Sequence, residues 1–281
     1  MEGKIPKPIK KWTCHKLECF TDWIESYVQT PVSTRRCYIE LYAGCGSCIC
    51  KGTQCQIDDS ELRVLKTKTK FDKYIFIAQD PQDAINLKRL VAPYSSKSNL
   101  EIIAGNCINE KITQELFDLI PRSASSFAFI DPPGYRRLRW STIKKLAKHS
   151  MDWKGHKMEL LIIFPLEMAL LRNLTRPECE ASITRLYGNR KWQEIKKGKL
   201  EGKIRPGKVR QKLVELFKAG LKGLGYRFVT DFSPSRLTNP PIYHIILASD
   251  SDSRIKMLGD AWGKDRYLPC ELLYGVKDKP S

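Results

Sequence analysis

Short apolar runs alternate with amphipathic stretches along most of the chain. Runs of branched and aromatic residues predict strands at 38–41, 74–78, 100–104, 127–130 and 159–164. Apolar positions three or four residues apart predict helices between them, at 58–68, 81–91, 110–120, 142–149 and 166–174. Strands that alternate with helices are typical of a mostly parallel sheet covered on both faces.

The two ends of the chain extend this pattern. An amphipathic helix is predicted at 12–27, inside an N-terminal helical segment 1–30. Segment 175–222 is predicted to be a basic insertion that begins irregularly and ends in a helix from about 208 to 224. Two last strands, at 226–230 and 243–248, and a short helix at 255–262 follow.

The order of these elements predicts the fold class. Five βα units followed by two strands, one of them antiparallel, give a doubly wound, seven-stranded, mostly parallel α/β sheet. That is the layout of class I S-adenosylmethionine (SAM) methyltransferases. We expect one such domain over residues 1–281, with the basic insertion after the fifth strand.

Composition excludes two classes of protein. Hydrophobic residues make up 42% of the 281 residues, too many for a chain that is mainly disordered. The longest apolar stretch, 160–171, is too short to span a membrane and contains Pro165 and Glu167. The basic start lacks the apolar run of a signal peptide, so we expect a cytoplasmic protein with reduced thiols.

Positive charge is concentrated in one segment. The chain carries 49 Lys and Arg against 31 Asp and Glu, a net charge of +18. Residues 185–222 hold 13 of these basic residues and three acidic ones, with aromatic residues between them. This favours a nucleic-acid partner over a solvated face. The candidate contacts are Arg185, Arg190, Lys191, Trp192, Lys196, Lys197, Lys199, Lys203 and Arg205.

The first candidate motif is a glycine turn after the first strand. Glu40 lies near the strand end, and Ala43, Gly44 and Gly46 follow it. Glycine lets a backbone pass close to a cofactor, and a carboxylate suits the cationic sulfonium and ammonium groups of SAM. We therefore predict a SAM site here, with a plain tight turn as the alternative.

The second candidate motif ends the fourth strand. Asp131, Pro132, Pro133 and Gly134 resemble the D/N-P-P-Y/F motif of methyltransferases that act on exocyclic amino groups of bases. In that motif the acidic side chain and a proline carbonyl hold the amine, and an aromatic ring stacks on the base. Here glycine takes the aromatic position and Tyr135 follows, so a strand-terminating turn is the alternative.

The second and third strands carry weaker signals. Such enzymes usually place an acidic residue after the second strand for the ribose hydroxyls, and often an Asp after the third for the adenine amine. This chain offers Asp80, two residues beyond Ala78, and Asn106. We expect these two to serve the nucleoside end of SAM.

Four of the ten cysteines crowd together after the glycine turn. The spacing of Cys45, Cys48, Cys50 and Cys55 could ligate zinc or an iron–sulfur cluster. No second cysteine pair or histidine pair completes a familiar pattern. Small buried residues in a tight turn and the following element are the alternative.

With these motifs placed, the chain resembles the three-Cys-motif partner (TcmP) family from about Trp12 to Trp262. The resemblance is carried by several stretches, namely Trp12 to Tyr27, Tyr38 to Gly46, Phe76 to Asp80, Gly105 to Cys107, Phe129 to Gly134, Ile163 to Pro165, Tyr187 to Trp192 and Tyr243 to Ser249.

The resemblance implies a SAM-methyltransferase-like Rossmann domain and a radical-SAM-like partner protein with three close cysteines. The chain departs from the family pattern at four places. Cys45 stands where the family has Pro, and Ala78 where it has a ribose-binding Glu. Asn106 stands where the family has Asp, and residues 58–61 stand where it tends to have Gly-Ser-Pro.

Three functions remain open at this point. The first is a SAM-dependent methyltransferase that acts on nucleic acid. The second is a catalytically silent methyltransferase fold that binds nucleic acid or a partner protein. The third is a metal or iron–sulfur protein that uses the cysteines at 45–55.

Overall fold

The computed structural model describes residues 6–31, 35–95, 98–105, 110–149, 157–166, 170–233 and 244–262. Its strands are β1 (Lys7–Ile9), β2 (Arg36–Ala43), β3 (Ser47–Cys50), β4 (Gln56–Asp58), β5 (Lys73–Ala78), β6 (Leu100–Ala104), β7 (Ser125–Ile130), β8 (Glu159–Phe164), β9 (Phe228–Phe232) and β10 (His244–Ser249).

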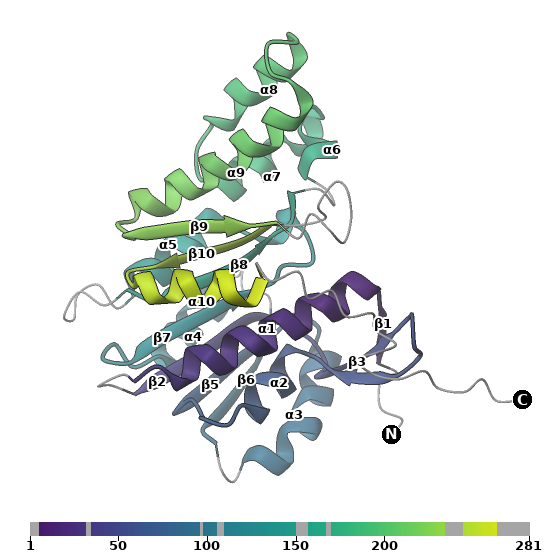
Figure 1. Ribbon diagram of the computed structural model, residues 1–281, viewed down its shortest axis with the longest axis vertical. Helices are drawn as coiled ribbons and strands as arrows, with labels where there is room; N and C mark the ends of the chain where they lie inside the picture. Colours follow the sequence, from purple (N-terminus) through teal and green to yellow (C-terminus); the bar gives the residue numbers. More distant parts are fainter. Residues whose placement is uncertain are drawn as a thin grey trace, which may run out of the picture.

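The helices connect and cover these strands (Figure 1). They are α1 (Lys11–Gln29), α2 (Ser60–Lys66), α3 (Pro81–Ser95), α4 (Glu110–Leu119), α5 (Trp140–Lys148), α6 (Leu171–Asn173), α7 (Glu180–Tyr187), α8 (Trp192–Leu200), α9 (Pro206–Gly223) and α10 (Asp252–Trp262), with 3₁₀ turns η1 (Tyr135–Arg137) and η3 (Pro177–Cys179).

The main sheet has seven strands in the order β6-β5-β2-β7-β8-β10-β9. The first five are parallel, and β10 is antiparallel to both of its neighbours. This confirms the predicted doubly wound sheet of the class I SAM-methyltransferase type. The chain leaves β2 in both directions, toward β5 and toward β7, so the carboxyl end of β2 is the switch point where α/β proteins bind ligands.

Side chains of the central strand β2 point alternately to the two faces of the sheet, and each face has its own hydrophobic core. In β2, Cys37, Ile39 and Leu41 face one core, and Tyr38 faces the other. The first core packs α4, α5, α7 and α9 against the sheet. The second packs α1, α2, α3 and α10 against the opposite face, and is rich in aromatic pairs such as Phe20–Phe129, whose ring centroids lie 4.6 Å apart.

The segment after the glycine turn is a small second sheet, which the sequence pattern did not predict. Strand β3 pairs in parallel with β1 and antiparallel with β4, in the order β1-β3-β4. The chain turns from β2 into this second sheet at Gly46, whose φ of +86° is a conformation that favours glycine. The N-terminal segment is thereby held beside the carboxyl end of β2.

The prediction for 175–222 was wrong at its beginning. Instead of an irregular segment, the structure shows helices α7 and α8 before α9. Gly188, with a φ of +68°, ends α7 in the left-handed conformation typical of a helix terminus. Within the helix predicted at 166–174, the described residues show the short α6.

Candidate functional site

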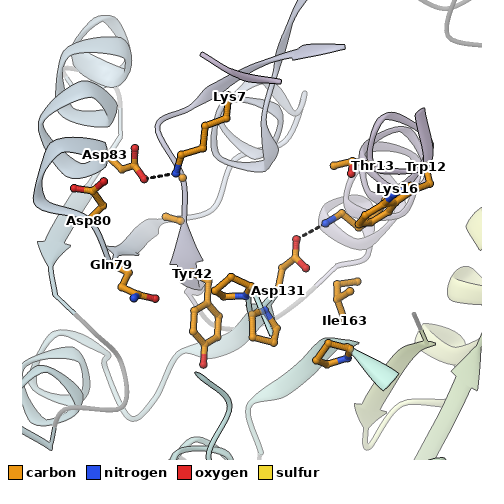
Figure 2. Close-up of a pocket in the computed structure, with 15 residues that line it drawn as sticks. Lys7, Trp12, Thr13, Lys16, Tyr42, Gln79, Asp80, Asp83, Asp131 and Ile163 are labelled. Carbon is orange, nitrogen blue, oxygen red and sulfur yellow. Dashed lines mark hydrogen bonds and ion pairs between the residues drawn. The ribbon is translucent and has the colours of Figure 1, made fainter. Parts of the chain in front are cut away.

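A cavity of about 470 Å³ opens at the carboxyl ends of the central strands. Strand β2 contributes Ala43 and is followed by Gly44 on the same wall, and the residues after β5 contribute Gln79 and Asp80. The turn after β7 contributes Asp131, Pro132 and Pro133 (Figure 2). Six of the ten residues predicted for catalysis and cofactor binding therefore line one cleft.

The N-terminal segment forms the other wall of this cleft. Lys7 from β1, and Trp12, Thr13 and Lys16 from the start of α1, all line the cavity. Figure 2 shows Lys16 pointing at Asp131 and Lys7 pointing at Asp83. The motif arguments did not assign a role to these side chains, although the stretch from Trp12 to Tyr27 carries part of the family resemblance.

The two lysines form ion pairs inside the cleft. Lys16 pairs with the Oδ2 atom of Asp131, with the two side chains 8% and 28% exposed. Lys7 pairs with Asp83 at 2.8 Å. The carboxylate predicted to hold a substrate amine is thus held by an ammonium group of the chain itself.

Glu40 lies behind the cleft rather than in its lining. It is 2% exposed and accepts hydrogen bonds from the Tyr38 hydroxyl at 2.9 Å and the Ser60 hydroxyl at 2.6 Å. Burial raises its pKa from 4.5 to about 8. Glu40 therefore does not make the direct contact with the cleft that the sequence suggested, and its burial favours the protonated carboxyl group.

Two more carboxylates stand with Glu40 behind the glycine turn. Asp59 and Glu61 come from the 58–61 stretch, where the chain departs from the family pattern. Glu61 is fully buried and accepts a hydrogen bond from the Gly44 N–H. Burial, reinforced by the neighbouring carboxylates, raises the pKa of both. The environment behind Gly44 therefore favours a cationic ligand.

Two further predicted site residues do not line the cleft, and a third is not described. Tyr135 is 1% exposed in the sheet core and contacts Ser182, so its ring is not available to stack on a base. Gly46 does not line the cleft, because the Leu87 and Leu90 side chains cover it. Asn106 lies outside the described residues. An aromatic side chain does reach the cleft, from Tyr42.

The structure also shows where the side chains of Ala78 and Gln79, at the end of β5, point. Ala78 ends β5 with its side chain fully buried in the core, so a glutamate there would be buried as well. Gln79, one residue later, is the side chain that faces the cleft. Gln79, and not the residue at position 78, can therefore contact a ligand in the cleft.

Most of the basic side chains predicted to contact nucleic acid are exposed. Arg185, Arg190, Lys191, Lys197, Lys203 and Arg205 are exposed, and Lys199 is half-buried. Trp192 is fully buried and donates to Thr184, so its prediction as a nucleic-acid contact is wrong. Lys196 pairs with Glu180, and Lys197 and Lys203 both pair with Glu201.

The basic surface of residues 185–222 does not line the cleft. Helix α8 projects at one end of the long axis of the molecule, at the top of Figure 1. None of its described residues lines the cavity. The turn η1, which follows Asp131, contacts η3 and α7: Arg136 donates to the sulfur of Cys179 in η3 at 3.2 Å, and Ser182 in α7 donates to the Tyr135 hydroxyl at 3.4 Å.

The four clustered cysteines point to different partners. Cys45 and Cys48 donate to the backbone carbonyls of Ser47 and Ile57, at 3.2 and 3.8 Å. Cys50 contacts Cys14, and Cys55 donates to Thr53. Among the described residues, no group of three or more His, Cys, Asp or Glu side chains could hold a metal ion. The geometry of this part of the chain gives no support to the metal hypothesis.

Comparison with known proteins identifies the fold but no family. No protein-family model matches the chain, and no curated protein matches its sequence. The TcmP resemblance is therefore not confirmed. In the described residues, no helix is long and apolar enough to cross a membrane.

Solved structures give three informative comparisons. Protein LPL1258 of Legionella pneumophila, of family model DUF519, matches with a TM-score of 0.52 at 10% identity, over 95% of this chain and 93% of that one. An O-methyltransferase from Bacillus cereus in complex with SAH gives 0.46 at 9% identity, over 82% and 79%. The METTL16 MTase domain gives 0.42 at 13% identity, over 83% and 67%. The strand order of the main sheet, with β10 antiparallel to both neighbours, is that of the class I SAM-methyltransferase fold.

Proposed function

We propose that the protein is a SAM-dependent methyltransferase that acts on an exocyclic amino group of a nucleic-acid base. One observation carries the proposal. The cleft at the switch point of the sheet brings together the glycine turn, Asp80 and the Asp131-Pro132-Pro133 turn around a single cavity of about 470 Å³.

The charges around the glycine turn fit the methionine end of SAM. Glu40, Asp59 and Glu61 lie behind Gly44, and the Oε2 atom of Glu61 is buried without a hydrogen-bond partner among the described residues. A cationic group near Gly44 would lower the cost of burying these carboxylates. Asp80, exposed at the rim, would take the ribose hydroxyls.

The cofactor, when bound, supplies the electrophilic methyl group. The chain supplies position and charge. The Asp131 carboxylate would accept a hydrogen bond from the target amine, and the Pro132 carbonyl would accept a second one. Because Lys16 pairs with the Oδ2 atom of Asp131, an amine would bind the Oδ1 atom or displace Lys16. Tyr42 lines the same cavity and would pack against the base in place of Tyr135.

Nucleic acid as the substrate is favoured by the exposed basic side chains of the α7–α9 region. Arg185, Arg190, Lys191 and Arg205 are exposed there, and such side chains bind phosphate with release of counterions. The radical-SAM-like partner implied by the family resemblance stays a prediction. It could be sought by co-purification from a cell that encodes both proteins.

A methyl-transfer assay tests the proposal. The full chain is incubated with methyl-labelled SAM and a pool of single-stranded RNA and DNA. We expect label in the nucleic acid, and a loss of at least about 100-fold in kcat/KM for Asp131→Ala. Asp118→Ala, a change at an exposed carboxylate of α4, is the matched control and should keep its activity. Equal activity of both variants would contradict the role of Asp131.

The catalytically silent fold is the second candidate. It is favoured by the ion pairs Lys16–Asp131 and Lys7–Asp83, in which lysines of the chain itself neutralise two carboxylates that line the cleft. This function predicts salt-sensitive binding of nucleic acid with no label incorporated from SAM. Incorporation above the Asp131→Ala background excludes it.

A further inference from the structure

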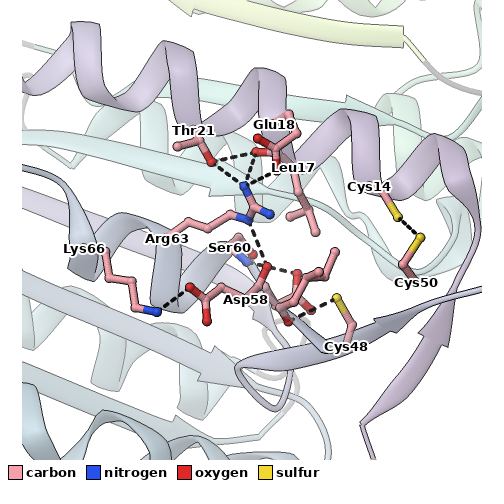
Figure 3. A network of polar contacts seen from close by, with 12 residues as sticks. Cys14, Leu17, Glu18, Thr21, Cys48, Cys50, Asp58, Ser60, Arg63 and Lys66 are labelled. Atoms are coloured by element: carbon pink, nitrogen blue, oxygen red, sulfur yellow. Dashed lines mark hydrogen bonds and ion pairs between the residues drawn. The ribbon is translucent and has the colours of Figure 1, made fainter. Parts of the chain in front are cut away.

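Two thiols from distant parts of the sequence meet beside the cleft. Cys14 in α1 and Cys50 at the end of β3 have their sulfur atoms 3.1 Å apart (Figure 3). Both side chains are fully buried, in a small cluster with Leu17, Cys48 and Ile57. Cys14 also donates to the Lys10 carbonyl at 3.6 Å, and Cys48 and Cys55 donate to the Ile57 and Thr53 carbonyls. The thiol pair is thus singled out by its sulfur–sulfur contact.

This contact joins the segment that covers the cleft to the hairpin that follows the glycine turn. Strand β1 pairs with β3, with Ile9 opposite Cys50, and the Lys51 N–H donates to the Ile9 carbonyl at 2.9 Å. The same segment carries Lys7 and Lys16 into the cleft. A covalent bond between Cys14 and Cys50 would therefore fix both lysines relative to Gly44.

Hydrogen bonds around Cys50 favour the thiolate form, which is the form of cysteine that reacts with oxidants. Burial raises the pKa of its thiol, but hydrogen bonds from Cys14 and from the Thr53 and Gly52 backbones outweigh burial and lower the pKa to about 7. The comparison within the chain is clear. Burial raises the pKa of Cys19 and that of Cys37 to about 12 each. Cys50 is thus the nucleophile and Cys14 the resolving thiol.

We propose that Cys14 and Cys50 form a reversible disulfide that fastens the β1–α1 segment across the cleft. The oxidant that we propose is hydrogen peroxide. The Cys50 thiolate attacks one oxygen of hydrogen peroxide, the O–O bond breaks, and hydroxide leaves and takes a proton to become water. The Cys14 thiol then attacks the Cys50 sulfenic acid, the S–S bond forms, and a second water leaves. A thiol reductant reverses the change.

Peptide mapping of the full chain tests this proposal without reference to methyl transfer. The reduced protein is treated with stoichiometric hydrogen peroxide, free thiols are alkylated, and the products are digested with trypsin. We expect the peptide from Trp12 to Lys16 to be linked to the peptide from Cys37 to Lys51, with fragmentation placing the link at Cys50. Dithiothreitol should abolish it.

Hydrogen exchange gives the second readout. Oxidation should slow amide exchange in residues 7–16 by at least tenfold and leave α9 unchanged. Cys14→Ser should lose both the link and the protection, and Cys48→Ser, a change on the same strand, should keep them. The proposal is overturned if Cys50 pairs with Cys48 or Cys55, or if the wild-type protein reaches only sulfenic or sulfinic acid. If the Cys14–Cys50 disulfide forms but amide exchange in residues 7–16 is not slowed, the proposal that the disulfide fastens this segment is overturned.

Discussion

Three carboxylates behind the glycine turn dominate the chemistry at the scale of single residues. Glu40 was predicted from its place at a strand end, but its function as a direct ligand was not confirmed, because Tyr38 and Ser60 occupy its oxygens. Asp59 and Glu61 entered the sequence comparison only as a departure from a family pattern. Their convergence depends on the hairpin β3–β4, which no periodic pattern revealed.

These carboxylates make stability depend on pH. Glu40 has a pKa of about 8 in the folded chain against 4.5 as its ordinary value. The folded state therefore holds more protons than the unfolded state between these two values, and stability falls as pH rises through this window. We expect the free energy of unfolding to be lower at pH 8 than at pH 6, by an amount on the order of a few kcal/mol.

Urea denaturation at the two pH values measures this difference. Glu40→Gln keeps hydrogen-bonding groups at the site and removes one titrating carboxyl, so it should flatten the pH dependence. Asp72→Asn, at an exposed carboxylate that caps the Arg36 N–H, is the control and should preserve it. A wild-type protein that gains stability from pH 6 to pH 8 would show that these carboxylates are ionised in the fold.

At the scale of elements, Trp140 joins the α7–α9 region to the turn that carries Asp131. Its ring lies against Gly188 at the end of α7 and Gly220 in α9, and forms an edge contact with Phe217 at 5.5 Å. The sequence signalled a basic segment here, and its aromatic residues were interpreted as a binding surface. They are core residues, because they lie on the inner faces of α7, α8 and α9.

A substitution at Gly188 tests the packing of Trp140 against the end of α7. A Cβ atom there would overlap the Trp140 ring, and its φ of +68° is strained for other residues. Gly188→Ala should lower the free energy of unfolding by about 2–4 kcal/mol, from overpacking and backbone strain together. Gly202→Ala shares a φ of +69° but meets no atom within 4 Å, and should cost only about 1 kcal/mol. Equal costs in thermal or urea unfolding would mean that Trp140 moves aside freely.

At the scale of the whole molecule, the concentration of charge was predictable and its position was not. The net +10 of residues 185–222 follows from composition alone. Its location depends on how α8 and α9 pack, and they project it away from the cleft toward one end of the molecule (Figure 1). The doubly wound, seven-stranded, mostly parallel sheet was predictable, because apolar runs of strand length alternated with helical periodicity along the chain.

The salt dependence of nucleic-acid binding tests whether this surface binds phosphate. Arg190→Gln with Lys191→Gln should reduce the slope of log K against log salt by about 1.4 for a single-stranded oligonucleotide. Lys88→Gln with Arg89→Gln removes the same charge from exposed positions of α3, near the opposite end of the sheet. An equal change in both double variants would indicate general attraction to a basic protein and no located surface.

The central claim is that the cleft binds SAM, and calorimetric titration of the folded full chain tests it most directly. We predict saturable heat at one site for the wild type and for Lys88→Gln, and binding weakened roughly tenfold by Asp80→Ala through the loss of a hydrogen bond. Circular dichroism on the same samples verifies the fold. A folded wild-type protein that gives no heat with SAM, and does not bind it by equilibrium dialysis, would contradict the account.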